Sequence, residues 1–215
     1  NAISLPVKSQ GTVEALRSIS LVAQVGGKVA AVADNFSDGA FFRQGDPLVR
    51  IETDDYEFAI ARAESQVAAA EQRLAEERGR NRQAKREWRD LGMAEANALF
   101  LREPQMKAAQ AALNAAQADL AAAKLALERT VVRAPFDGRV ASKHVDVGQY
   151  VTPAAPVADV YATDRFEVRL PLNATQVEKL TANKRNPSAL APFELDHPVT
   201  LESALGSEIA RWQGR

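Results

Sequence analysis

Few residues in this sequence could perform chemistry. It has no Cys and two His, His144 and His197, which lie far apart in the chain. The lack of thiols excludes disulfides, Cys-ligated zinc, iron–sulfur clusters and thiol nucleophiles. Two distant imidazoles do not favour a His-based metal site, and neither has an Asp or Ser nearby at a spacing that suggests hydrolysis. We therefore expect no catalytic residue, no metal site and no cofactor.

Charge and hydropathy remove two further classes of protein. The net charge is -1, with 27 basic and 28 acidic residues, whereas a nucleic-acid-binding protein usually carries a basic excess. No apolar run approaches the roughly 18 residues that a membrane-spanning helix needs. The adjacent acids Asp54 and Asp55 are explained by a helix start, where acidic side chains stabilise the N-terminal end of the helix dipole. These exclusions indicate a chain that does no chemistry of its own.

The distribution of alanine predicts where the helices lie. Residues 54–130 hold 22 of the 41 Ala, but only two of the 11 Gly and one of the 10 Pro. Because Ala favours helices and Gly and Pro break them, a long helical segment is expected between two flanks that are rich in breakers.

Apolar residues in this segment repeat with heptad spacing. One stripe steps by four and three residues from Tyr56 to Leu91, and a second carries Leu or Met every seven residues from Leu99 to Leu127. Such stripes are typical of coiled coils. The stripes meet near Gly92, the midpoint of the segment. The pattern predicts an antiparallel helical hairpin with arms of about 37 residues, or roughly 55 Å at 1.5 Å per residue.

Several residues predict local features of this hairpin. Glu77 and Asn81 interrupt the first stripe, and Gly79 lies between them, so we expect an irregularity near residues 77–81. Pro104 is tolerated only in a first turn, so the second long helix is expected to begin near Glu103, after a short helical piece over residues 95–100. A basic cluster lies toward the end of the first arm. Such a run is usually a solvated helix face, and the alternative is a docking surface. The residues of this cluster are Arg78, Arg80, Arg82, Lys85, Arg86 and Arg89.

The two flanks are copies of each other. Residues 23–30 and 134–141 both follow the pattern Ala-x-apolar-x-Gly-basic-Val-Ala, and two further blocks match in the same order. The offset is 111 residues in the first block and 109 afterwards. Each half is expected to supply about four short strands of one β-sandwich, since neither could bury its apolar face alone. Gly27 and Gly138 occupy equivalent places and are expected at a positive φ or a close approach.

The two ends of the chain predict a further group of strands. Alternating apolar and polar residues at Leu5–Ile19, Phe166–Leu170 and Pro198–Leu205 indicate strands. Asn173 is expected to cap a short helix that ends at Leu180. The strands of both ends are expected to pair and to form part of a β-barrel whose remaining strands lie outside this sequence.

Three motifs carry a family resemblance: Val25–Val29, the spacing Gly39 to Gly45 followed by Asp46-Pro47-Leu48, and Thr130–Val140. Together with the order of the elements, they resemble the HlyD-like periplasmic adaptor (membrane fusion protein) family of bacterial efflux pumps. The resistance-nodulation-division (RND) adaptors are the most similar.

The resemblance implies an α+β fold with three parts. A split lipoyl-like β-sandwich (residues 19–53 and 131–163) is interrupted by a long antiparallel α-helical hairpin. The hairpin spans residues 54–130 with its tip near 91–103. Part of a β-barrel domain (residues 1–18 and 164–215) completes the chain.

The resemblance also implies a function. It is that of a non-enzymatic periplasmic adaptor in multidrug resistance, which links an inner-membrane efflux transporter, preferably of RND type, to a TolC-type outer-membrane channel. Such adaptors self-associate into a trimeric or hexameric ring that forms or seals the export conduit. The full-length protein is anchored to the inner membrane, through an anchor expected outside this sequence, and no nucleic acid is involved.

Family members carry an Arg-Leu-Ser type pattern at the hairpin tip, where they meet the channel. Arg86 can take the place of the Arg, Leu91 lies one residue from the expected Leu, and Asn97 falls near the expected Ser. The partner-binding residues implied by this resemblance are those at and around the tip: Arg86, Leu91, Gly92, Asn97, Leu99 and Arg102.

Other functions share parts of this pattern. An adaptor of an ABC-type exporter or a type I secretion system has the same layout, although type I adaptors tend to have longer hairpins. A metal-efflux adaptor is expected to offer Met or His ligands, but Met106 fits the apolar stripe and Met93 is the only other Met. A lipoyl or biotin carrier domain presents a modifiable Lys between its halves, where this chain has Glu52-Thr53-Asp54-Asp55.

Overall fold

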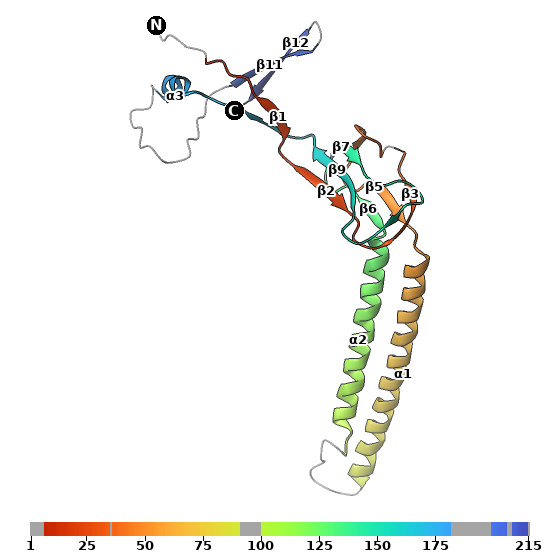
Figure 1. Ribbon diagram of the computed structural model, residues 1–215. Coiled ribbons are helices and arrows are strands. Elements are labelled where there is room, and N and C mark those ends of the chain that lie inside the picture. Colours follow the sequence, from red (N-terminus) through yellow and green to blue (C-terminus); the bar gives the residue numbers. More distant parts are fainter. Residues whose placement is uncertain (1–6, 35, 91–99, 182–198, 206–207, 215) are drawn as a thin grey trace. The chain divides into compact units, whose positions relative to one another are not determined.

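A computed structural model describes residues 7–34, 36–90, 100–181, 199–205 and 208–214 (Figure 1). The chain divides into two compact units, one formed by Val13–Val168 and the other by Asn1–Thr12 together with Arg169–Arg215. The larger unit combines a β-sandwich with a helical hairpin. This mixed architecture confirms the predicted α+β fold class.

The sandwich consists of two four-stranded antiparallel sheets. The first has the order β2-β9-β7-β4, and the second has the order β6-β5-β3-β8. The strands of the first sheet are Ser18–Val22, Pro156–Ala162, Gly138–Lys143 and Phe41–Phe42. The strands of the second are Val131–Arg133, Pro47–Ile51, Gly27–Val32 and Tyr150–Val151. Each sheet therefore contains strands from both sequence copies.

The internal repeat is confirmed by strand order and by hydrogen bonding. Exchanging every strand for its copy (β2 for β6, β3 for β7, β4 for β8 and β5 for β9) converts one sheet order into the other. The Ala23 amide donates to the Ala155 carbonyl at 2.9 Å, and the equivalent Ala134 amide donates to the Asp46 carbonyl at 3.0 Å. The two halves are thus related by an approximate twofold and are intertwined.

The core of the sandwich is shared equally by the two halves. Its most deeply buried side chains are at most 2% exposed, and three pairs of them are repeat equivalents: Val29 with Val140, Leu48 with Val157, and Ile51 with Val160. Burying a large aliphatic side chain contributes roughly 1.5–3 kcal/mol. Because each half supplies one member of every pair, neither half could form this core alone.

The two predicted glycine positions are confirmed. Gly27 has a φ of +151°, and a Cβ there would lie 2.5 Å from the Ile51 side chain. At Gly138 a Cβ would overlap the Tyr161 carbonyl oxygen of the neighbouring strand β9. Both positions exclude larger residues because the backbone approaches a neighbour closely.

The hairpin consists of α1 (Asp54–Asp90) and α2 (Glu103–Glu128), which run antiparallel (Figure 1). The predicted start of the second helix at Glu103 is confirmed, and Pro104 lies in its first turn. The predicted short helix over residues 95–100 lies almost wholly outside the described residues. Among the helices that the structure describes, none is both long and apolar enough to cross a membrane.

The remaining elements come from the two ends of the chain. Strand β1 (Thr12–Ala15) pairs with β10 (Phe166–Arg169), and β11 (Val199–Leu205) pairs antiparallel with β12 (Glu208–Gly214). Helix α3 spans Ala174–Thr181. The predicted cap is confirmed, because the Gln176 amide donates to Asn173 Oδ1 at 2.8 Å.

Candidate functional site

The seam between the two helices follows the predicted heptads. In the described part of the hairpin, every predicted seam position is buried or half-buried. The seam is centred on a cluster of four residues that are at most 9% exposed: Ala70, Leu74, Leu113 and Ala116. Small alanines let the helix axes approach closely, while the leucines fill the spaces between them. The heptad prediction is thus confirmed along both arms.

A polar brace replaces the apolar seam toward the tip. The Glu77 carboxylate accepts hydrogen bonds from Arg102 Nε at 2.9 Å and Arg102 Nη2 at 3.0 Å. Arg80 also donates to it at 2.8 Å. Asn81, which is 4% exposed, donates from its side-chain amide to the Leu101 carbonyl. The brace therefore joins α1 to the residues immediately before α2.

The expected irregularity near residues 77–81 is wrong. Helix α1 is continuous from Asp54 to Asp90, because the polar side chains of Glu77 and Asn81 find partners across the seam. A Cβ at Gly79 would meet nothing within 4 Å, so this glycine interrupts no packing. The polar residues fix the alignment of the two helices instead of distorting one of them.

Arg102 is held in an unusual backbone conformation at the start of α2. Its φ of 56° and ψ of 27° lie in the left-handed region, which costs a non-glycine residue roughly 1–2 kcal/mol. The bidentate contact with Glu77 holds the side chain in place, and hydrogen bonding from Arg102 lowers the pKa of the Glu77 carboxyl. Arg102 therefore positions the second helix.

An aromatic pair packs near the same end. The Trp88 and Phe100 rings lie 5.0 Å apart between centroids at an interplanar angle of 56°. This tilted arrangement is favourable for aromatic rings. Trp88 occupies a seam position on α1, as the heptads predict, and Phe100 lies just before α2.

The base of the hairpin is tied to the sandwich by one hydroxyl group and one backbone carbonyl. The Tyr56 hydroxyl on α1 donates to the Gly26 carbonyl at 2.5 Å, and burial raises the pKa of Tyr56. After α2, the Thr130 carbonyl accepts a hydrogen bond from the Ile51 amide of β5 at 2.8 Å. Lys28 lies near the same base and forms an ion pair with Glu52 at 3.2 Å. Both ends of the hairpin are thus braced by polar contacts.

The structure describes only some of the predicted tip residues. Arg86 lies on the exposed surface of α1, and Arg102 lies in the polar brace. Leu91, Gly92, Asn97 and Leu99 lie outside the described residues, as does most of the predicted tip region.

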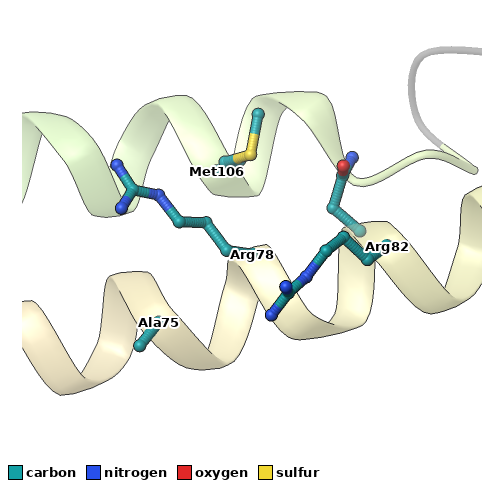
Figure 2. A pocket seen from close by; sticks show the side chains of 5 residues that line it. Ala75, Arg78, Arg82 and Met106 are labelled. Atoms are coloured by element: carbon teal, nitrogen blue, oxygen red, sulfur yellow. The ribbon is translucent and has the colours of Figure 1, made fainter.

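A shallow groove of about 420 Å³ lies beside the seam on the tip side of α1. It is lined by Ala75, Arg78, Asn81, Arg82 and Met106. Figure 2 shows Arg78 reaching across to α2, Arg82 lying along α1, and Met106 on α2. Arg78 donates to the neutral Gln110 side chain at 3.3 Å. The groove therefore combines two cationic side chains with the apolar side chains of Ala75 and Met106 and the polar side chain of Asn81.

A second polar cluster, on the sandwich, corrects the expectation for His144. His144 Nε2 lies 2.8 Å from Asp159 Oδ2, and the Ser142 hydroxyl donates to the same oxygen at 3.1 Å. Hydrogen bonding from His144 lowers the pKa of Asp159. Ser142 pairs with Asp159 across strands β7 and β9. That register, which local spacing does not reveal, is the signal that would have predicted the cluster.

The geometry of this cluster does not match a hydrolytic triad. In a triad, histidine bonds the nucleophile through one ring nitrogen and the acid through the other. Here Ser142 and His144 meet on the same Asp159 oxygen, and Nε2 is also the ring atom nearest Ser142, at 3.4 Å. The repeat equivalents of Ser142 and His144 are Ala31 and Ala33, so the cluster occurs in one half of the sandwich only. It orders the outer surface of one sheet.

Two interlocked β half-motifs interrupted by a helical hairpin define a membrane fusion protein of the barrel-sandwich type. A family model described as "RND MFP, barrel-sandwich hybrid domain" matches residues 17–163, well over half of the 215 residues. The chain belongs to this family of RND membrane fusion proteins, and the resemblance found in its sequence is confirmed.

Individual relatives agree with this assignment. The "Multidrug resistance protein MdtA" of Proteus mirabilis (strain HI4320) is 26% identical over 199 residues, which cover 92% of this chain and 48% of that protein. The MdtA of Yersinia pestis (strain Pestoides F) is 26% identical over 189 residues, covering 86% of this chain and 42% of that protein. The chain thus spans about half the length of the curated relatives it matches.

A solved structure shows the same fold. It is a MacA–MexA chimeric protein containing the Pseudomonas aeruginosa MexA α-hairpin domain, with a TM-score of 0.57 at 22% identity. The match covers 79% of this chain and 56% of the chimera. At this identity the likeness concerns the fold alone.

Proposed function

We propose that the chain is a non-enzymatic periplasmic adaptor of a tripartite efflux pump. It links an inner-membrane transporter, preferably of RND type, to a TolC-type outer-membrane channel, and the full-length protein is anchored to the inner membrane. The observation that carries the proposal is the RND membrane fusion protein match across both half-motifs and the hairpin between them. An adaptor of an ABC-type exporter or type I secretion system is the second candidate, because such adaptors resemble this chain in the order of two β half-motifs separated by a helical hairpin.

In this proposal the hairpin tip docks on the channel by helix-to-helix packing. The contact residues are those around the tip: Arg86, Leu91, Gly92, Asn97, Leu99 and Arg102. The polar brace supports the proposal, because it fixes the alignment of the two helices close to the contact. Arg102 contributes through its bidentate ion pair with Glu77, which positions the chain that leads into α2.

The adaptor self-associates into a trimeric or hexameric ring, in which weak single-tip contacts gain from multivalency. Five alanines at heptad spacing on the exposed face of α2 support side-by-side packing of hairpins: Ala108, Ala111, Ala115, Ala118 and Ala122. The large exposed side chains Phe58 and Leu125 also favour burial against a neighbour. The lipoyl-like part (residues 19–53 and 131–163) and the β-barrel part (residues 1–18 and 164–215) stack around the conduit.

Site-specific cross-linking tests the docking. Because these 215 residues have no Cys, a Cys introduced at Arg86 adds the only thiol within them for a short photo-cross-linker, and the unsubstituted full-length protein measures the background labelling. We expect the full-length R86C protein to cross-link to the outer-membrane channel in cells. The matched variant R62C is also exposed on α1 but lies near its start, and it should not cross-link. A channel adduct at Arg62 with none at Arg86 contradicts docking through the tip.

Co-purification from the same cells distinguishes the two candidate types of pump. Co-purification of the detergent-solubilised adaptor should recover an RND transporter. Recovery of an ABC transporter alone favours the second candidate, and loss of pump-dependent resistance on deletion confirms that the recovered pump is active.

A further inference from the structure

Four basic residues form a single stripe along the tip half of α1. Arg78, Arg82, Lys85 and Arg89, here named the basic stripe, are spaced by four, three and four residues, so they lie on one face of the helix. All four are exposed. At 1.5 Å per residue, the stripe extends about 16 Å along the helix.

The same helical face carries the opposite charge toward the base. Continuing the spacing from Arg78 toward the start of α1 gives alternating alanines and glutamates: Ala75, Glu71, Ala68, Glu64, Ala61 and Glu57. Glu64 lies 3.9 Å from Lys124 of α2. The face therefore changes sign once, between Glu71 and Arg78, whereas a solvated helix face typically intersperses both signs.

Within the described residues, the nearby acids form no ion pair with the basic stripe. Glu77 is bound by Arg80 and Arg102. Glu76 and Glu87 accept hydrogen bonds from Gln72 and Gln83, respectively.

The stripe residues themselves make few contacts. Within the described part of the chain, Arg78 bonds the neutral Gln110 and no acid, and Arg82, Lys85 and Arg89 form no ion pair. Like charges three or four residues apart repel each other by a few tenths of a kcal/mol per pair. The described part of the helix thus keeps a cationic edge without ion pairs at a small cost in stability.

The groove beside the stripe adds shape to this charge. Ala75 and Met106 line the groove together with Arg78, Arg82 and the buried Asn81 (Figure 2). Methionine adapts readily to a packed apolar side chain. A narrow line of positive charge beside a groove that contains Met106 fits a helix with acidic residues along one face.

We propose that the basic stripe binds a helix of the protein that receives the tip, and that this helix carries carboxylates at positions i, i+4, i+7 and i+11. This inference rests on the proposed function and specifies the chemistry of the partner surface. Arginine binds carboxylates bidentately, and a second helix repeats the spacing of the stripe. An apolar side chain on the partner helix enters the groove over Met106. The contact surface thereby extends from the tip along one side of α1.

The probe for this proposal is a pair of lactam-stapled alanine-based peptides. The stripe peptide carries Glu at positions i, i+4, i+7 and i+11, and the scrambled peptide carries four Glu distributed around the helix. We expect the chain to bind the stripe peptide at least about tenfold more tightly, since about 1.4 kcal/mol corresponds to a factor of ten. Binding is measured by fluorescence anisotropy at low ionic strength and should weaken as salt is added.

Matched variants assign the binding to the stripe. The triple variant R82Q/K85Q/R89Q removes three exposed charges and should bind the stripe peptide about tenfold more weakly. The control variant R62Q/R73Q/R129Q removes three exposed charges elsewhere on the hairpin and should bind like the unchanged chain. Circular dichroism should give equal helix content for all three proteins.

Three outcomes overturn the proposal. These are equal binding of the two peptides, equal weakening in both triple variants, and preferential binding of the chain to 3:1 phosphatidylcholine–phosphatidylglycerol vesicles over the stripe peptide. The cross-linking test at Arg86 is independent of these measurements. A channel adduct at Arg86 combined with one of these outcomes rejects the stripe alone, while the lack of any adduct rejects the adaptor docking itself.

Discussion

The sandwich and the hairpin belong to one compact unit but are stabilised differently. The sandwich encloses Phe36, Leu48 and Ile51 between two sheets and leaves each at most 2% exposed. The hairpin has one seam, and several of its buried positions are small residues such as Ala63 and Ala84. Large aliphatic side chains contribute most to burial energy, so the sandwich is expected to be the more stable region.

The difference shows why the polar brace lies in the hairpin. A seam of alanines tolerates sliding, because neighbouring alanines offer nearly the same surface. Glu77 meets Arg102, and Asn81 meets the Leu101 carbonyl, at only one alignment of the chain. Polar seam residues cost stability but specify register. The sandwich needs no such brace, because its interlocked strands leave only one way to close the core.

Removing a large buried side chain should give the largest difference in stability loss between the sandwich and the hairpin. Leu48→Ala should lower the free energy of unfolding by about 2–5 kcal/mol, because the site is closed on all sides. Leu113→Ala in the hairpin should lie at the lower end of that range, because the seam borders solvent and can relax. Urea denaturation followed by far-UV circular dichroism measures both. Leu125→Ala, at an exposed position, is the control and should change little. A larger effect for Leu113 than for Leu48 would reverse the comparison.

The same substitution at two glycines should have opposite signs. A Cβ at Gly138 would overlap the Tyr161 carbonyl and lie 2.9 Å from the Phe42 ring, so Gly138→Ala should destabilise by about 1–3 kcal/mol. A Cβ at Gly79 would meet open space, so Gly79→Ala should stabilise the helix by about 0.5–1 kcal/mol. Thermal unfolding measures the two shifts. Shifts of the same sign would show that the hairpin and the sandwich do not differ in packing at these positions.

Features with a fixed period along the chain could be predicted from the sequence. The heptads from Tyr56 onward gave the seam, and the 111- and 109-residue offsets gave the intertwined halves. Both depend on spacing that is preserved in one dimension. The start of α2 could also be predicted, because Pro104 restricts where a helix can begin.

Contacts between distant residues could not be predicted in the same way. Glu77 and Arg102 are separated by 25 positions, and their meeting depends on the exact alignment of the two arms. His144 and Asp159 are 15 positions apart and meet because β7 and β9 pair in one register. The basic stripe was visible as a cluster of charges, but the acids that leave it unpaired could be assigned only from the structure.

Loss of the brace should affect the hairpin alone. Arg102→Met keeps much of the side-chain length but leaves Glu77 with Arg80 as its remaining cationic partner. We expect faster hydrogen exchange of the Met106 amide, which donates to the Arg102 carbonyl at 3.0 Å, with unchanged exchange in β7 and β9 of the sandwich. Arg62→Met, at an exposed position on α1, serves as the control and should change neither region. Faster exchange throughout the sandwich would mean that the brace supports the whole unit.

Acidification should weaken the polar brace, and this is the smallest effect that we expect. Because Arg102 lowers the pKa of Glu77 below its ordinary value of 4.5, the folded state favours the charged carboxylate more than the unfolded state does. The resulting stabilisation is complete above the ordinary pKa and is lost as the pH falls through the lowered folded-state pKa. Intrinsic amide exchange slows as the pH falls through this range, so the readout is the protection relative to the intrinsic rate. This protection should decrease near the start of α2 below pH 4.5. Glu77→Gln should remove this pH dependence, because a neutral side chain cannot titrate. If the variant keeps the same pH dependence of exchange, a group other than Glu77 controls it. Glu77 then does not account for a difference in acid sensitivity between the hairpin and the sandwich.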